Sequence, residues 1–283
     1  KKRCCPPNAS KSAQVAAYKF LDDPQAKYFD AVERILMNGA MRGVLQPGGG
    51  EEKHALAQTL CDAAGWVYAT SERNVYLNLF VNSTARIVTD SLRMIVDQMT
   101  SLPHDNRVKI RISGLPRGKY PFTLKIRIPD WAVGRNGYSQ RFAFVEQGKQ
   151  TFPIYINGRE EDVLTENGYM MIHRKWNSGD EVFFDLPMDI RVLRVKEGTG
   201  QMRGVVAFQR GPWMYSAEGV PPSTYCVVLR SPQIDENLTA GGNVRLRIDA
   251  YSTTDVSVDA STPDATLYAV PFVERGGWVW WPE

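Results

Sequence analysis

Two adjacent cysteines near the start of the chain, in Cys4-Cys5-Pro6-Pro7-Asn8, are the residues best able to do chemistry. A thiolate is a strong nucleophile and a good zinc ligand, and nearby positive charge favours it. Lys1, Lys2 and Arg3 supply that charge, and the two prolines restrict the backbone that presents the sulfurs. The pair therefore predicts a nucleophile or a soft-metal site. The alternative is a pair of structural thiols near a chain end.

Two sulfurs do not complete the four-ligand site that zinc usually occupies. The side chains that could add to Cys4 and Cys5 are Glu51, Glu52, His54 and Cys61, but none stands at a recognised metal-ligand spacing. Four cysteines, unevenly placed, do not predict a disulfide scaffold. Cys61 and Cys226 are expected to be ordinary buried thiols.

Other catalytic motifs are missing from the sequence. It contains no glycine-rich phosphate loop, no Gly-x-Ser-x-Gly elbow and no His-Glu-x-x-His pattern. Paired carboxylates for sugar hydrolysis come from distant parts of a chain, so spacing does not reveal them. Asp22-Asp23 is expected near a helix cap, and Glu160-Glu161-Asp162 in a solvated turn. His104 and His173 are expected to be structural or exposed.

Length and charge limit the possible partners. The chain has 283 residues, of which 43% are hydrophobic, so two or three domains are expected. Lys and Arg number 34 against 31 Asp and Glu, and no long run of like charge occurs, so no nucleic-acid partner is expected. No apolar stretch reaches the roughly 18 residues that span a bilayer, so no membrane partner is expected either. The sequence begins without methionine, and we expect it to be a fragment.

Helical periodicity is confined to the first quarter of the chain. Asp23-Pro24 predicts a helix start, and the apolar spacing after it predicts a helix over residues 24–42 that ends before the glycines of 46–50. A second stripe through Leu56 and Leu60 predicts a helix that ends at Gly65. Such amphipathic helices must bury their apolar faces against another element.

From residue 72 the hydrophobic pattern alternates, which is typical of strands with one buried face. Strands are expected near residues 75–80, 108–112, 124–128, 152–156, 169–173, 181–186, 205–209, 225–230, 244–249 and 266–273. Short strands separated by turns predict a mainly β fold with two antiparallel β-sandwich domains behind a short helical segment. The expected domains are 1–71, 72–197 and 198–283, with the last boundary in the polar stretch 195–203.

A set of ordered motifs resembles glycoside hydrolase family 127, the beta-L-arabinofuranosidase-like proteins. Each is short, but together they cover most of the region from residue 72 onward. They are Cys4-Cys5-Pro6-Pro7-Asn8, residues 28–39, residues 75–80, residues 122–132, Gly168-Tyr169, residues 176–180, Leu186-Pro187-Met188, Arg210-Gly211-Pro212, and residues 267–272 continuing to Trp278-Val279-Trp280.

The resemblance implies a fold and a mechanism. The family builds a helical (α/α)6 barrel followed by β-sandwich domains, so residues 1–71 would resemble the end of that barrel. By motif, Cys4 would be the nucleophile and a zinc ligand, and Cys5 a zinc ligand, in a retaining hydrolase acting on a furanoside or oligosaccharide. A further expected partner is a barrel segment that this sequence lacks, or a second copy of the chain.

The sequence also departs from the family pattern. The Glu-x-Cys motif that supplies further zinc ligands is absent, no acid/base glutamate is recognisable, and the helix with Glu33-Arg34 follows the cysteine pair instead of preceding it. The rival interpretation is a non-catalytic module that binds carbohydrate or has a structural role. Trp131 and the aromatic segment Trp278–Trp281, expected to be exposed, would then stack on sugars, although Trp278–Trp281 could also plug a domain interface.

Overall fold

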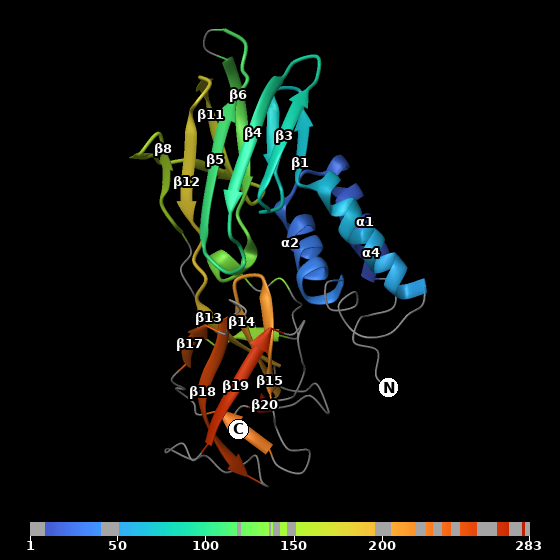
Figure 1. Ribbon diagram of the computed structural model, residues 1–283, viewed down its shortest axis with the longest axis vertical. Helices are drawn as coiled ribbons and strands as arrows, with labels where there is room; N and C mark the ends of the chain where they lie inside the picture. The colour runs from blue at the N-terminus through green and yellow to red at the C-terminus, as the bar shows by residue number, and fades with distance from the viewer. Residues whose placement is uncertain are drawn as a thin grey trace.

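The computed structural model describes residues 9–40, 51–117, 120–135, 137, 142–145, 151–195, 205–218, 225–228, 234–238, 244–253, 265–271 and 279–280. These residues form a two-sheet sandwich, a layer of helices on one side of it, and a third sheet beyond one end (Figure 1). None of the helices in these ranges is long and apolar enough to cross a membrane.

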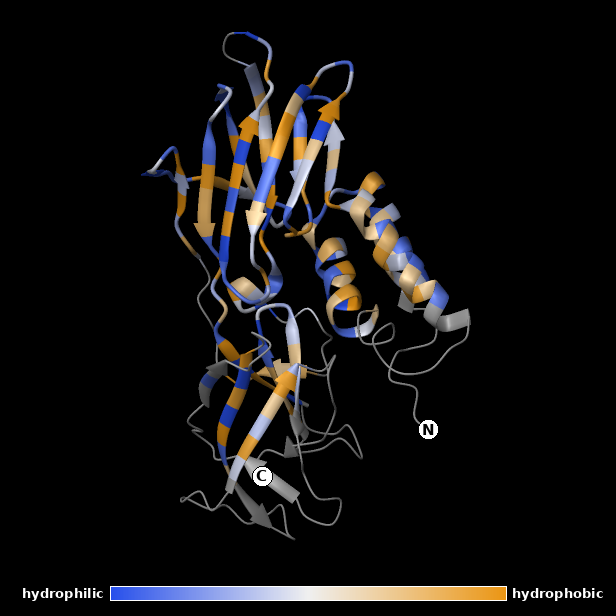
Figure 2. Ribbon diagram, viewed as in Figure 1, coloured by the Kyte–Doolittle hydropathy of each residue, from blue (hydrophilic) through white to orange (hydrophobic). Residues whose placement is uncertain are grey.

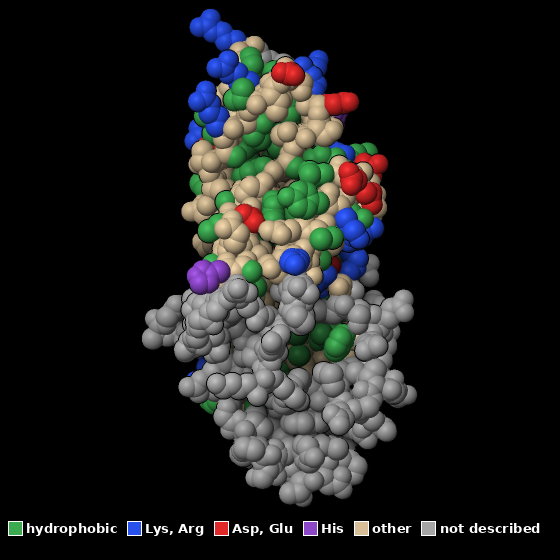
Figure 3. Space-filling view, turned by 90° about the vertical axis from the view of Figure 1, so that its right-hand side faces the viewer, with side chains coloured by type: hydrophobic (Ala, Val, Ile, Leu, Met, Phe, Trp, Pro, Cys, Tyr) green, Lys and Arg blue, Asp and Glu red, His purple; other side chains and the backbone are tan. Residues whose placement is uncertain are grey.

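The helical layer contains α1 (Ala9–Asp22), α2 (Ala26–Arg34), the π-helix η1 (Ile35–Ala40), α4 (Glu51–Ala63) and the short 3-10 helix η2 (Ala64–Trp66). The buried face of α1 is made of Ala13, Ala16, Ala17 and Phe20. Its outer face leaves apolar side chains exposed, and Figure 3 shows such side chains among charged ones on the helical side of the molecule.

Two sheets form the sandwich. The first contains, in spatial order, β1 (Tyr68–Ser71), β2 (Asn74–Leu77), β6 (Tyr120–Arg127), β11 (Tyr169–Trp176) and β10 (Leu164–Glu166). The second contains β3 (Ser83–Val88), β4 (Arg93–Thr100), β5 (Arg107–Ser113), β12 (Glu181–Asp185), β8 (Ile154–Ile156) and β9 (Arg159–Glu160). Pairing is antiparallel except between β2 and β6, which run parallel.

The space between these sheets is filled by the inward residues of alternating strands (Figure 2). Val108, Ile110 and Ile112 of β5 are fully buried, whereas the intervening residues reach the surface. Trp176 stacks on Phe122 with ring centroids 5.1 Å apart. The apolar residues that alternate along the sequence therefore form the core between the two sheets.

The outer face of the first sheet is covered by the helices. Phe20 of α1 and Phe29 of α2 pack at centroid separations of 5.0 Å, and Phe20 also meets Tyr76 of β2 at 5.3 Å. Tyr76 meets Tyr169 of β11 edge to face at 5.4 Å. Because the sheet is buried on both faces here, the helices and the sandwich form one packed unit.

The third sheet contains, in order, β15 (Trp213–Glu218), β19 (Ala265–Pro271), β18 (Val244–Thr253), β16 (Tyr225–Val228), β20 (Val279–Trp280), β14 (Val205–Arg210), β13 (Ile190–Val195) and β7 (Phe142–Phe144), with β17 (Ile234–Leu238) beside β18. β16 and β20 run parallel. Phe208, Leu246 and Ile248 are fully buried in its core.

Asn38 of η1 ties the helical layer to the third sheet. Its side-chain nitrogen donates to the carbonyl of Pro212 at 2.9 Å, and its side-chain oxygen accepts from the backbone nitrogen of Met214 at 2.8 Å. The amide thus pairs with the chain entering β15 as another backbone strand would. A single side chain therefore joins segments more than 170 positions apart.

The mainly β prediction is confirmed, and every strand range expected from the alternation contains a strand. The pattern missed β1, β3, β4, β7, β9, β10, β13, β15 and β17. In β4 the inward positions are Met94, Val96 and Gln98, so a polar residue interrupts the apolar series.

The helix prediction for residues 24–42 is only partly right. α2 begins after Gln25, and the carboxylate of Asp23 instead accepts hydrogen bonds from the side chains of Gln25 and Tyr28. The helix widens into η1 at Ile35, and residues 41–50, including the glycines, lie outside the described ranges. The helix through Leu56 and Leu60 is confirmed as α4. α1 was missed because Val15, Tyr18 and Leu21 lie on its exposed face and blur the periodicity.

The division into domains 1–71, 72–197 and 198–283 stays a prediction. The resemblance of the helices to the end of a barrel also stays a prediction. Sheet membership changes earlier than residue 198, since β13 pairs with β14 of the third sheet. β7, which lies within the sequence range of the sandwich, pairs with β13 as well. The stretch 196–204 lies outside the described residues.

Candidate functional site

The two cysteines predicted as nucleophile and metal ligands, Cys4 and Cys5, lie outside the described residues. His54 and Cys61 are both on α4, but within the described ranges no three His, Cys, Asp or Glu side chains gather closely enough to hold a metal ion. Cys61 is exposed, so its predicted burial is wrong. The side chain of Cys226 is outside the described set.

A buried ionic cluster lies where α2 meets the first sheet. Arg127, the last residue of β6, is completely buried and extends between two carboxylates of α2. Its two terminal nitrogens donate to Asp30 and to Glu33, each at 2.6 Å, and its Nε donates to the carbonyl of Asn78 at 2.5 Å. Asp30 and Glu33 are three positions apart, so one helix face presents both carboxylates to one guanidinium.

The 3-10 helix η3 (Asp130–Val133), which follows β6 directly, extends this cluster. The indole nitrogen of Trp131 donates to the second carboxylate oxygen of Glu33 at 2.7 Å. The backbone nitrogen of Asp130 donates to Asp30 at 3.3 Å, and the Asp130 carboxylate pairs with Arg34. Trp131 is 3% exposed, so its predicted role as an exposed sugar platform is wrong. The prediction for Trp278–Trp281 concerns side chains that lie outside the described residues.

The electrostatics of the cluster bring the pKa of one carboxyl, that of Asp30, close to neutral pH. These contacts join three carboxylates, Asp30, Glu33 and Asp130, to two guanidinium groups. Burial raises the pKa of Asp30 to about 7, against the lowering effect of Arg127, and the charges of Asp130 and Glu33 add to the rise. Burial lowers the pKa of Arg127, but Glu33 and Asp30 outweigh it, and the net shift is upward. Asp30 can therefore exchange a proton near neutral pH while Arg127 stays charged.

Asp30 also borders a cavity of about 500 Å³. Arg34, Asp130, Arg135 and Asn167 line the same cavity. An ionisable carboxyl beside a polar cavity has the chemistry needed to bind hydroxyl groups and to transfer a proton. The Arg127 pairing also fixes the helix on the sheet, so this cluster has a structural role whatever enters the cavity.

Sequence reasoning did not find this cluster, although signals for it were present. Asp30 and Glu33 fall on the buried face of α2 beside Phe29 and Val32, where charged residues are rare unless they are paired. Arg127 continues the strand Leu124–Ile126 on the opposite face of the sheet. The two longest motifs of the family resemblance, 28–39 and 122–132, are the segments that meet here.

The architecture defines a β-sandwich protein that carries helices on one sheet and a further sheet beyond. Residues 74–188, from β2 to just past β12, match the family model described as the middle domain of beta-L-arabinofuranosidases of glycoside hydrolase family 127. Over these residues the chain contains the middle domain of glycoside hydrolase family 127. The match coincides with the sandwich that supplies Arg127, Asp130 and Trp131 to the cluster.

A relative and two solved structures are also similar to this chain. A non-reducing end beta-L-arabinofuranosidase of Bifidobacterium longum subsp. longum is 22% identical, over 75% of this chain and 35% of the relative. A solved GH127 beta-arabinofuranosidase has a TM-score of 0.81 at 24% identity, covering 96% of this chain and 48% of the other. A GH127 beta-L-arabinofuranosidase from Geobacillus stearothermophilus T6 has a TM-score of 0.75 at 20% identity, covering 99% and 52%. The chain thus spans about half or less of the length of these proteins.

Proposed function

We propose that this chain is part of a glycoside hydrolase of the beta-L-arabinofuranosidase type. The observation that carries the proposal is the match of residues 74–188 to the middle domain of that family. The relative named as a non-reducing end beta-L-arabinofuranosidase supports it, as does the likeness in fold to structures titled beta-arabinofuranosidase. The proposed substrate is a furanoside or an oligosaccharide that contains one.

The proposed nucleophile is Cys4, and the proposed outcome is retention of configuration. The Cys4 sulfur forms a bond to the anomeric carbon while the glycosidic bond breaks and the leaving oxygen takes up a proton. The oxygen of a water molecule then forms a bond to the same carbon as the carbon–sulfur bond breaks, and the thiolate is regenerated. The water gives up a proton to the group that protonated the leaving oxygen. Two inversions at one carbon give a product with the configuration of the substrate.

The proposed ligands for zinc are Cys4 and Cys5. A bound zinc ion would hold the Cys4 sulfur as a thiolate near neutral pH. The described residues do not offer a matching set of further ligands, because no group of three His, Cys, Asp or Glu side chains among them could hold a metal.

The test is hydrolysis of p-nitrophenyl beta-L-arabinofuranoside, with metal content measured by mass spectrometry. We expect Cys4→Ala to abolish turnover and Cys5→Ala to lower bound zinc. Cys61→Ala is the matched control, since that thiol is exposed and belongs to no metal-binding group of the described residues. Turnover that survives Cys4→Ala would rule out the thiolate mechanism. Binding of oligosaccharides without any turnover would favour the non-catalytic module instead.

A further inference from the structure

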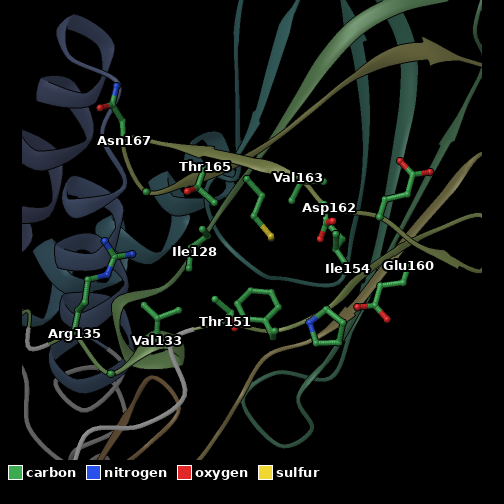
Figure 4. Close-up of a pocket in the computed structure, with 16 residues that line it drawn as sticks. Ile128, Val133, Arg135, Thr151, Ile154, Glu160, Asp162, Val163, Thr165 and Asn167 are labelled. Carbon is green, nitrogen blue, oxygen red and sulfur yellow. The ribbon is translucent and has the colours of Figure 1, made fainter.

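A groove lies at one edge of the sandwich, where β9 and β10 are the outermost strands of their sheets. Its volume is about 1020 Å³, and β8, β9, β10 and the turn after η3 contribute to its lining (Figure 4). Pockets that hold small ligands measure about 300–1,000 Å³, so this groove has room for a ligand of several sugar rings.

Charged groups stand at the two ends of the groove, and apolar side chains stand between them together with the hydroxyls of Thr151 and Thr165. In Figure 4, Arg135 and Asn167 lie on the side of the helices, and Glu160 lies at the opposite side. Ile128 and Val163 lie between. Phe152 and Met170 add an aromatic ring and a thioether to the apolar lining. A suitable ligand therefore presents hydrogen-bonding groups at its ends and C–H surface at its centre.

The turns that carry the polar groups are held in place. Gly134 ends η3 in the left-handed region at φ 73°, and the backbone nitrogen of Arg135 donates to the carbonyl of Asp130 at 2.9 Å. Asn167 and Gly168 form a tight turn with φ values of 52° and 82°. The Asn167 carbonyl accepts from the backbone nitrogen of Ala26 at 2.9 Å. The groove is thus largely formed before any ligand enters.

The groove is adjacent to the smaller cavity beside Asp30. Arg135, Asn167 and Gly168 line both spaces. Carboxylates therefore border the combined space at both ends, from Asp30 and Asp130 on one side and from Glu160 on the other. Glu161 and Asp162 line the groove as well, so carboxylates outnumber the cations Lys27, Arg34 and Arg135 around the two spaces. The charge therefore favours a neutral ligand over an anionic one.

We propose that this groove binds a neutral oligosaccharide. Sugar hydroxyls pair with carboxylate, amide and guanidinium groups, and sugar C–H faces pack on rings such as Phe152. This inference rests on the proposed function, because it takes the ligand to be the furanose-containing chain that the enzyme would shorten.

Titration calorimetry on the full chain with beta-linked L-arabinofuranose oligosaccharides tests the proposal. We expect Arg135→Ala to weaken binding about tenfold, as expected for loss of one hydrogen bond to a charged group. Thr165→Arg, which places a long side chain in the groove from an exposed position on β10, should weaken it as much. Arg86→Ala is the control, since Arg86 is an exposed arginine of β3 that lines neither space.

The outcomes separate this inference from the proposed function. Equal affinity for the wild type, Arg135→Ala and Thr165→Arg overturns the groove proposal, and hydrolysis of the aryl furanoside by the wild type would leave the proposed function standing. A loss of affinity in both groove variants but not in Arg86→Ala supports the groove, even if the wild type hydrolyses nothing. Absence of any oligosaccharide binding by the wild type also overturns it.

Discussion

The two faces of the first sheet are buried by different means. The face toward the second sheet meets a core that is apolar apart from Gln98 of β4, with Leu124 and Ile126 of β6 fully buried. The face toward α2 combines aromatic rings with the ion pairs of Arg127. An apolar core tolerates many arrangements of similar volume, whereas a guanidinium between two carboxylates accepts one position of the helix. The comparison suggests that the inner face supplies stability and the outer face fixes the helix register.

The largest effect is expected from removing the cation of the outer face. Arg127→Ala leaves Asp30 and Glu33 buried without their partner, so we expect a loss of about 3–5 kcal/mol in the free energy of unfolding, measured by urea denaturation. Lys109→Ala is the control, because Lys109 pairs with Glu181 at 2.9 Å on the surface and should cost less than about 1 kcal/mol. Similar losses for the two variants would show that the buried Arg127 pairs contribute no more to stability than a surface ion pair does.

A somewhat smaller loss is expected on the inner face. Leu124→Ala creates a cavity between the sheets and should cost about 2–4 kcal/mol. Because no charge is involved, this loss should be the same at pH 5 and pH 8, whereas the loss from Arg127→Ala should change with pH. Urea denaturation of both variants at the two pH values makes the comparison. A pH-dependent loss for Leu124→Ala would show that the faces are coupled.

Within any single pH unit, the smallest effect is a slope with pH that comes from Asp30. Its pKa is about 7 in the folded protein against 3.8 for an ordinary Asp, so the folded state holds the proton more tightly. The stability that this proton supplies is full below about pH 4 and is lost as the pH rises to about 7, by at most about 1.4 kcal/mol per pH unit. Asp30→Asn should remove this part of the slope. An unchanged slope in that variant would show that Asp30 ionises at its ordinary pKa.

The difference between the faces also explains what the sequence could predict. Alternation along β5 and β6 identified the inner core, because each apolar residue there obeys a period of two. Asp30, Glu33 and Arg127 obey no such rule, since a charge on a buried face is explained only by a partner almost 100 residues away. The same applies to the groove, whose lining comes from several turns and strands.

The family motifs carried information that periodicity did not. Residues 28–39 and 122–132 were recognised as motifs, and the structure shows that their side chains bind each other. Trp131 was expected at the surface because no local pattern places a hydrogen-bond acceptor beside its indole. The cysteine pair remains a prediction, and only the tests of Cys4 and Cys5 address it.

The Asn38 bridge has a consequence for how the chain denatures. Breaking η1 would leave the Pro212 carbonyl and the Met214 amide without the group that satisfies them, so melting of the helical layer should loosen the start of β15 at the same time. The amino-terminal and carboxy-terminal parts should then share one cooperative transition in calorimetry. Deleting the first forty residues should accordingly speed up the hydrogen exchange of backbone amides at the start of β15, beyond position 210.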